Sequence, residues 1–153
     1  MSRMLLLLCL LPALAVAGDI EGQVIAIADG DTLTVLHGRE QVKVRLTDID
    51  APEKAQPFGQ RARQSLAELC FHEQARVEDK GRDRYGRTLG RVWCAGVDAN
   101  AEQVRRGMAW VYDRYVTDRA LYALQDKARA EQRGLWSEGT PTPPWEWRHR
   151  AHK

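Results

Sequence analysis

The segment IEGQVIAIADGDTLTVLHGREQVKVRL, residues 20–46, contains three apolar runs that are separated by two turn signals. Residues 20–27 are mostly apolar, whereas residues 32–36 and 42–46 alternate between apolar and polar side chains. Alternation with a period of two indicates strands that bury one face. Asp29-Gly30 is a hairpin turn signal, and His37-Gly38-Arg39-Glu40 supplies the second reversal. The segment therefore predicts a three-stranded antiparallel meander.

Beyond residue 46 the spacing of apolar residues changes to that of a helix. Ala62, Leu66, Leu69 and Cys70 fall on one helical face. Two further strands are predicted at residues 75–79 and 89–93, with a turn rich in glycine and arginine between them.

The second half of the chain predicts two more helices. Asn100 and Gln103 resemble a capping box, and Gly107 is placed to end the short helix that they begin. A last helix is predicted at residues 118–132, with Gly134 as its stop signal.

This order of elements predicts an α+β protein that is mainly β. We expect a five-stranded OB-fold Greek-key β-barrel with about three flanking α-helices, in one domain at residues 18–138. Residues 139–153 contain prolines, tryptophans and bases, and we expect an irregular tail. Large aromatic side chains commonly pack in cores or at barrel ends, which is expected for Trp93, Trp110 and Trp136. Trp145 and Trp147 either fold back onto the barrel or contact a partner.

Residues 1–17 have the layout of a secretory signal peptide. Arg3 precedes a continuous apolar run, and Ala15-Val16-Ala17 is a small-x-small cleavage site. The alternative is a membrane anchor, but the apolar run is short for a bilayer span. We therefore expect an exported protein, periplasmic or secreted, which has no stable membrane association after cleavage. A monomer is the expected state.

Bulk composition is that of a soluble protein, with 44% hydrophobic and 29% charged residues. The formal net charge of +2 says little, but bases cluster at residues 82–91 and again at residues 148–153. Clustered bases attract polyanions, although such clusters are also ordinary solvated surface. Export would expose Cys70 and Cys94 to oxidation, which favours a disulfide over two separate buried thiols.

Four short motifs carry polar residues that are candidates for a functional site. Each has an ordinary structural explanation in isolation: a hairpin turn, the start of a helix, a polar turn and a short helix. In chain order they are Asp29-Gly30-Asp31-Thr32, then Arg45 followed by Asp50-Ala51-Pro52-Glu53, then Asp83-Arg84-Tyr85-Gly86-Arg87, then Asn100 to Ala109. Together and in this order, they are similar to the motifs of the thermonuclease (staphylococcal-nuclease-like) family over residues 20–136.

The resemblance implies the OB-fold barrel and a calcium-dependent nuclease site. Asp31 and Asp50 correspond to the side-chain Ca²⁺ ligands, and the backbone carbonyl of Ala51 corresponds to a third ligand. Such hard oxygen ligands suit calcium, and an incomplete set predicts weak binding that a substrate oxygen improves. Many family members have threonine where this chain has Ala51, and a backbone ligand survives that difference.

The same resemblance implies the roles of three further residues. Glu53 corresponds to the proposed general base, and Arg45 and Arg87 correspond to two catalytic arginines that hold the charged phosphate. The implied reaction cleaves DNA and RNA at the bond to the 5′ oxygen and leaves a 3′-phosphate.

Substrate contacts are expected from aromatic side chains, since base stacking tolerates sequence and favours single strands. The candidates are Tyr85 with its neighbour Arg84, and Tyr112 or Tyr115. The alternative for Tyr112 is that it packs in the core.

Two other classes of function compete with a nuclease. A non-catalytic OB-fold module would bind oligonucleotides without cutting them, and a structural envelope protein would need no converging charges. A degenerate module should have lost at least one functional residue. The five residues expected to catalyse or hold metal are all present: Asp31, Arg45, Asp50, Glu53 and Arg87.

Overall fold

The predicted meander forms the first half of a closed sheet. The computed structural model describes residues 18–151, so the expected signal peptide lies outside the described residues. Asp29 pairs with Thr32 across the first turn, and Thr32 pairs with Arg45 on the next strand. The meander strands are β1 (Ile20–Asp29), β2 (Thr32–His37) and β3 (Glu40–Leu46).

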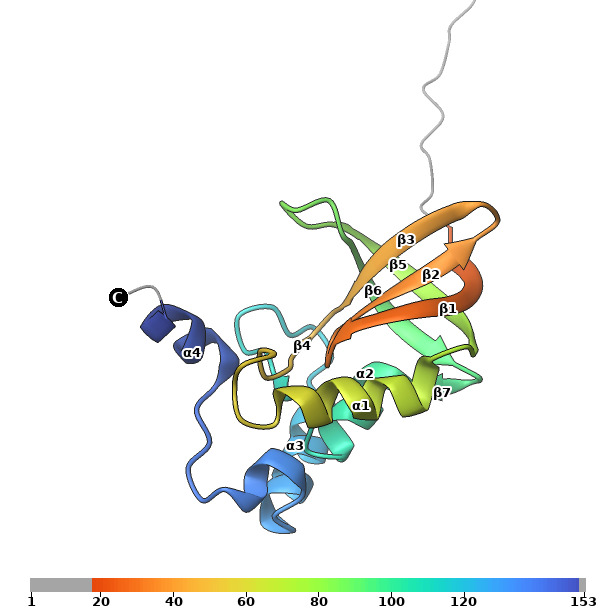
Figure 1. Cartoon of the computed structure of the whole chain (residues 1–153). Helices are drawn as coiled ribbons and strands as arrows, with labels where there is room; N and C mark the ends of the chain where they lie inside the picture. Colours follow the sequence, from red (N-terminus) through yellow and green to blue (C-terminus); the bar gives the residue numbers. More distant parts are fainter. Residues whose placement is uncertain (1–17, 152–153) are drawn as a thin grey trace, which may run out of the picture.

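Two later strands close the barrel. β5 (Gln74–Arg82) pairs antiparallel with β1, and β6 (Thr88–Cys94) pairs antiparallel with β5. β6 also pairs parallel with β3, which brings Arg45 opposite Leu89. Within the described chain these five strands form the predicted α+β, mainly β barrel, which is confirmed (Figure 1). β7 (Val97–Asp98) pairs antiparallel with β6, while β4 (Ile49–Asp50) and β8 (Trp110–Val111) form a separate pair.

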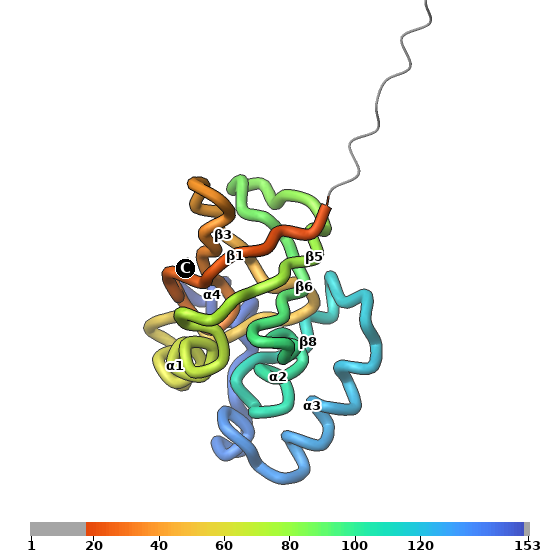
Figure 2. The backbone as a smooth tube through the Cα atoms, turned by 90° about the vertical axis from the view of Figure 1, so that its right-hand side faces the viewer, coloured from red at the N-terminus to blue at the C-terminus, as the bar shows by residue number. Residues whose placement is uncertain are grey.

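Helices gather at one end of the barrel, as both views show (Figures 1 and 2). Ala62, Leu66 and Cys70 are fully buried on α1 (Gly59–Cys70), which packs on β1. α2 (Ala99–Arg105) packs between α1 and α3 (Leu121–Ala130), and a 3₁₀ turn follows at Gly134–Ser137. The helices close the apolar interior that the alternating strands create.

Asn100 and Gln103 do not form a capping box, so that prediction is wrong. Asp98 is the N-cap residue of α2 and accepts a hydrogen bond from the Ala101 amide at 3.0 Å. The Asn100 side chain instead accepts from the Val92 amide and donates to the Thr47 carbonyl. A capping box satisfies local donors, whereas this buried side chain satisfies backbone groups from distant segments.

The tail is not irregular, because α4 (Pro144–Ala151) is a helix. Pro144 opens it, where a proline loses no helical hydrogen bond. The Trp145 ring stacks on Tyr112 with centroids 5.4 Å apart, and it meets Trp110 edge-on at 5.7 Å. Aromatic contacts therefore fold the tail back onto the barrel, which is one of the two alternatives that the sequence left open.

The ends of α1 and β6 are joined covalently. A disulfide links Cys70 to Cys94, whose Cα atoms are 5.1 Å apart, and both residues are fully buried.

Trp136 is buried and packs edge-on against Trp110, whereas Trp93 lies under the guanidinium of Arg76. Across residues 18–151, no helix is both long and apolar enough to cross a membrane.

Candidate active site

The site begins at the hairpin between β1 and β2, which carries Asp31. The buried amide of Gln103 donates to the Gly30 carbonyl at 2.7 Å and so holds this turn against the helices. The Asp31 Oδ2 atom accepts a hydrogen bond from the Ala51 amide at 2.7 Å. A side chain on Gly30 would not fit, since its Cβ would lie 2.7 Å from the Cβ of Ala51. Gly30 thus permits the Asp31 turn to touch the segment after β4.

Asp50 comes from β4, whose path is set by a buried aspartate two residues earlier. Asp48 has a left-handed backbone, with φ of 69°, and its carboxylate accepts hydrogen bonds from the amides of Thr117 and Asp118. Asp50 then pairs with Trp110 on β8. A β4–β8 pair of only two residues is weak, so these contacts hold Asp50 in place.

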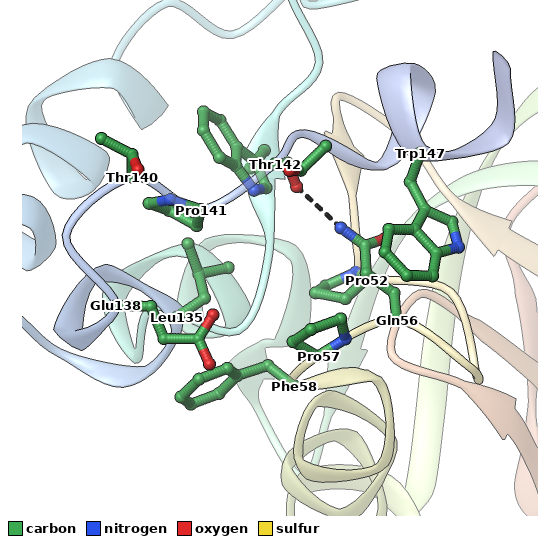
Figure 3. A pocket seen from close by; sticks show the side chains of 11 residues that line it. Pro52, Gln56, Pro57, Phe58, Leu135, Glu138, Thr140, Pro141, Thr142 and Trp147 are labelled. Carbon is green, nitrogen blue, oxygen red and sulfur yellow. Dashed lines mark hydrogen bonds between the residues drawn. The ribbon is translucent and has the colours of Figure 1, made fainter. Parts of the chain in front are cut away.

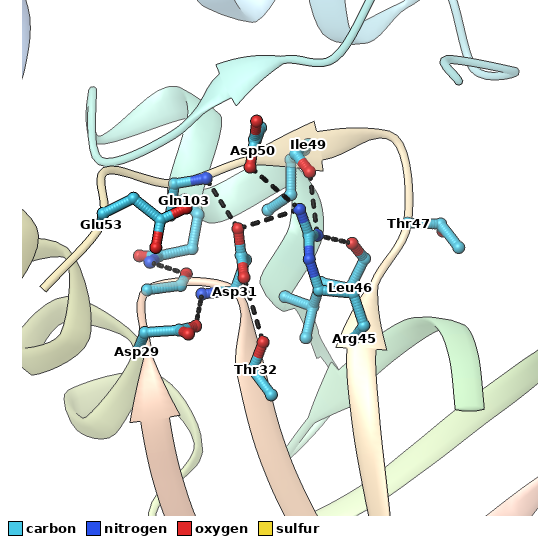
Figure 4. A network of polar contacts seen from close by, with 12 residues as sticks. Asp29, Asp31, Thr32, Arg45, Leu46, Thr47, Ile49, Asp50, Glu53 and Gln103 are labelled. Atoms are coloured by element: carbon cyan, nitrogen blue, oxygen red, sulfur yellow. Dashed lines mark hydrogen bonds and ion pairs between the residues drawn. The ribbon is translucent and has the colours of Figure 1, made fainter. Parts of the chain in front are cut away.

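Arg45 joins the two aspartates. Its Nη2 atom lies 3.1 Å from Asp31 Oδ2 and 3.1 Å from Asp50 Oδ1, and its Nη1 donates to the Leu46 and Ile49 carbonyls (Figure 4). Oxygens from two carboxylates therefore face one point. Arg45 lies 14 positions after Asp31 and 5 positions before Asp50. Asp31 and Arg45 meet because β2 pairs with β3, where Thr32 is opposite Arg45.

Burial makes this carboxylate pair costly to ionise. Burial raises the pKa of Asp31 to about 7; the neighbouring Arg45 opposes the shift, while Asp29 and Asp50 add to it. Burial also raises the pKa of Asp50, against the opposing hydrogen bond from Arg148. Two buried carboxylates that face one another are stabilised by a nearby cation.

The donor set suits a hard divalent cation. Carboxylate oxygens are the ligands that calcium prefers, and two of them converge here. In the described part of the chain, no three His, Cys, Asp or Glu side chains form a metal-binding group. A metal at Asp31 and Asp50 would therefore need backbone, water or substrate oxygens as well.

Glu53 lies at the open side of the pair, with a side chain that is 41% exposed. Its backbone amide donates to Gln56 Oε1 at 3.1 Å, and its carbonyl accepts from the Gln56 amide. The alternative in which Asp50, Pro52 and Glu53 start a helix is wrong, because α1 begins only at Gly59. Glu53 is consequently on a turned segment that presents its carboxylate beside Asp50.

Arg87 lies in a separate loop between β5 and β6. Its Nε atom donates to Asp83 Oδ2 at 2.7 Å, and its guanidinium lies 5.6 Å from the Tyr85 ring. Although partial burial acts the other way, the hydrogen bonds from Arg87 hold the pKa of Asp83 below its usual value. The structure thus brings Asp31, Arg45, Asp50 and Glu53 together, but pairs Arg87 with Asp83 instead.

The candidate substrate residues occupy two places. Tyr85 is 68% exposed in the β5–β6 loop, and the guanidinium of Arg84 lies 4.8 Å from its ring. Tyr115 is 57% exposed and meets Tyr112 edge-on, whereas one face of Tyr112 is covered by Trp145. The exposed rings of Tyr85 and Tyr115 are therefore freer to stack on a base than Tyr112 is.

Sequence reasoning missed one residue of the site, Arg148. Its Nη2 lies 2.8 Å from Asp50 Oδ2, and its Nη1 lies 2.7 Å from Glu53 Oε1 and 3.2 Å from Asp50 Oδ1. The only signal was the basic cluster at residues 148–153, which does not say where the bases lie.

Comparisons with known proteins identify the family of the chain. Residues 43–138 match the family model described as Staphylococcal nuclease homologue. An "Uncharacterized endonuclease" of Escherichia coli O157:H7 is 47% identical over 133 residues, which cover 86% of this chain and 87% of that protein. A "Micrococcal nuclease" of Shigella flexneri is 47% identical over 146 residues, covering 88% and 83% respectively. An "Uncharacterized endonuclease" of Haemophilus influenzae is 44% identical over 82% of this chain. The barrel carries an acidic cluster formed by Asp31, Asp50 and Glu53. The matches show that the chain belongs to the staphylococcal nuclease homologue family.

Proposed function

We propose that this member of a nuclease family is a calcium-dependent hydrolase of phosphodiester bonds in DNA and RNA. The observation that carries the proposal is the convergence of Asp31, Asp50 and Arg45 beside Glu53. A non-catalytic binding module has no need for two buried carboxylates at one point, because their desolvation is unfavourable.

Calcium would be held by Asp31, Asp50 and the Ala51 carbonyl. When bound, the cation supplies positive charge that polarises the phosphate. Two carboxylates form an incomplete ligand set, so we propose that binding is weak and that a substrate oxygen strengthens it.

The remaining groups act on water and phosphate. Glu53 accepts a proton from the attacking water, whose oxygen forms a bond to phosphorus. Arg45 donates to the phosphate oxygens as negative charge builds up, and Arg87 does so after it turns away from Asp83. The bond to the 5′ oxygen breaks, this oxygen takes up a proton and leaves as a 5′-hydroxyl, and the other product carries a 3′-phosphate.

Two further proposals concern the substrate and the place of action. The exposed Tyr85 and Tyr115 rings favour single strands, because an unpaired base offers its face for stacking. The layout of residues 1–17 supports export to the periplasm or medium, and a Cys70–Cys94 disulfide suits an oxidising compartment. We propose that the mature chain acts there as a monomer.

Digestion of heat-denatured DNA by the purified mature chain tests the proposed activity. We expect cleavage with calcium and none after excess chelator. Repeating the assay with RNA tests the second substrate. Binding without cleavage, in calcium and with the fold verified by circular dichroism, would favour the oligonucleotide-binding module instead.

A further inference from the structure

The C-terminal segment is fixed beside the candidate active site by contacts at both of its ends. Before α4, the Thr142 carbonyl accepts a hydrogen bond from Gln56 Nε2 at 2.7 Å (Figure 3). The other end of the same amide, Gln56 Oε1, accepts from the backbone of Glu53. One buried side chain therefore ties the tail to the turn that presents Glu53.

Within α4, aromatic packing sets the helix orientation. Trp145 is stacked on Tyr112 with an interplanar angle of 5°, and Trp147 lines a pocket together with Pro52 and Gln56 (Figure 3). Trp145 and Arg148 are three residues apart, so they lie on neighbouring faces of one turn. Docking of the indole thus places the guanidinium over Asp50 and Glu53.

Arg148 donates three hydrogen bonds to the carboxylates of Asp50 and Glu53. Both of its terminal nitrogens are used, and the side chain is still 37% exposed. Burial acts against the charged form, but the hydrogen bonds that Arg148 donates to Asp50 and Glu53 raise the pKa of Arg148 above its usual range. The guanidinium is therefore a fixed positive charge that can be reached from solvent.

Charge balance indicates what this guanidinium does when substrate binds. The metal-free site has up to three formal negative charges, on Asp31, Asp50 and Glu53 when they are ionised. It has two positive charges, on Arg45 and Arg148. A divalent cation held by Asp50 would compete with Arg148 for the same carboxylate oxygens. Once these oxygens face the cation, the donors of Arg148 need another acceptor, and a phosphodiester is an anion with suitable oxygens.

We propose that Arg148 is a third arginine of the active site, which neutralises Asp50 and Glu53 in the metal-free enzyme and donates to the substrate phosphate in the loaded enzyme. The inference rests on the proposed nuclease function. The donor atoms are Nη1 and Nη2, which change partner from carboxylate to phosphate oxygen. The C-terminal helix is thereby part of the substrate site.

The test compares Arg148→Ala and Arg148→Lys with a matched control, Arg150→Ala. Arg150 lies on the same helix and has a side chain that is 69% exposed; within residues 18–151, its ion-pair partner is Glu146 of α4 at 3.6 Å. Calcium affinity is measured by titration calorimetry without nucleic acid. Turnover number and KM are measured on a single-stranded oligodeoxynucleotide at saturating calcium, and urea unfolding checks that each variant is folded.

Two opposite shifts are expected for Arg148→Ala. Calcium should bind about tenfold more tightly, because a competing cation has left its ligand. The kcat/KM for cleavage should fall by about tenfold to a hundredfold, which corresponds to the loss of a hydrogen bond to a charged group. Arg148→Lys should recover only part of the activity, since an ammonium cannot hold two oxygens in a planar fork. Arg150→Ala should match the wild type.

The other outcomes overturn the proposal. Faster cleavage by Arg148→Ala would show that the C-terminal helix inhibits the site. Unchanged cleavage would show that the contact of Arg148 with Asp50 and Glu53 is only structural. Unchanged calcium affinity would show that Arg148 does not compete for Asp50. If the wild type failed to cleave DNA at all, the nuclease proposal would fail, and the calorimetry would still report whether Arg148 holds Asp50.

Discussion

Loss of the Cys70–Cys94 disulfide should destabilise the barrel by a calculable amount. The bond closes a loop with a sequence separation of 24, and this length gives about 3.5 kcal/mol at 25 °C in the chain-entropy model. The effect arises because the link restricts the unfolded chain. Domains of this size are commonly stable by only about 5–15 kcal/mol, so the loss would remove a large share of the stability.

Urea unfolding followed by tryptophan fluorescence measures this change. The oxidised mature protein is compared with the same protein in reductant and with the Cys70→Ala/Cys94→Ala double variant. Both cysteines are fully buried, so the variant carries an additional packing loss of about 1 kcal/mol. The variant serves as the control, because reductant should not change its unfolding curve.

The reasoning would be refuted if reduction lowered the free energy of unfolding of the wild type by less than about 1 kcal/mol. An equal response of the double variant to reductant would also refute it, since that variant has no bond to break. Where the reduced protein is still folded, cleavage should persist, because neither cysteine is among the residues of the candidate site.

Three further predictions follow from the site. Glu53→Gln should slow DNA cleavage by about a hundredfold or more, as expected for a lost general base, while calorimetry should find calcium affinity within a few fold of wild type. Gly30→Ala should lower the free energy of unfolding in urea by about 1–3 kcal/mol, because its Cβ would lie 2.6 Å from that of Ala62 and 2.7 Å from that of Ala51. Asp31→Asn should stabilise the metal-free protein at pH 8. The pKa of Asp31 in the native state is raised to about 7 from an ordinary 3.8. The free energy of unfolding of the wild type therefore decreases as the pH rises from 3.8 to 7. In urea unfolding, the stability advantage of the variant should consequently be smaller near pH 4 than at pH 8.

Local patterns predicted most of the barrel. The alternation at residues 32–36 and 42–46 and the Asp29-Gly30 turn specify β2, β3 and their hairpins, because period and turn chemistry act between neighbours. The same local logic failed at Asn100 and in the tail. Asn100 resembles a cap, yet its partners are Val92 and Thr47. The tail prolines suggested irregular chain, yet Pro144 starts a helix.

The candidate site divides in a similar way. The sequence shows, in chain order, the motifs that contain Asp31, Arg45, Asp50 and Glu53. The barrel brings these four residues together. The Arg87 motif was just as readable, but its guanidinium pairs with Asp83 within its own loop. A motif names a residue type at a position, whereas hydrogen bonding to neighbours determines where a long side chain points.

The amino-acid sequence alone predicted the order of the strands, the acidic motifs and the resemblance to a nuclease family. Each of these features depends on residues that are close to one another in the sequence. The contacts that complete the site join residues far apart: Gln103 holds the Gly30 turn across 73 positions, and Arg148 reaches Asp50 across 98. No local period or spacing encodes such pairs. They arise only when the barrel closes and the Trp145 ring docks on Tyr112, since packing in three dimensions brings the tail to the acids.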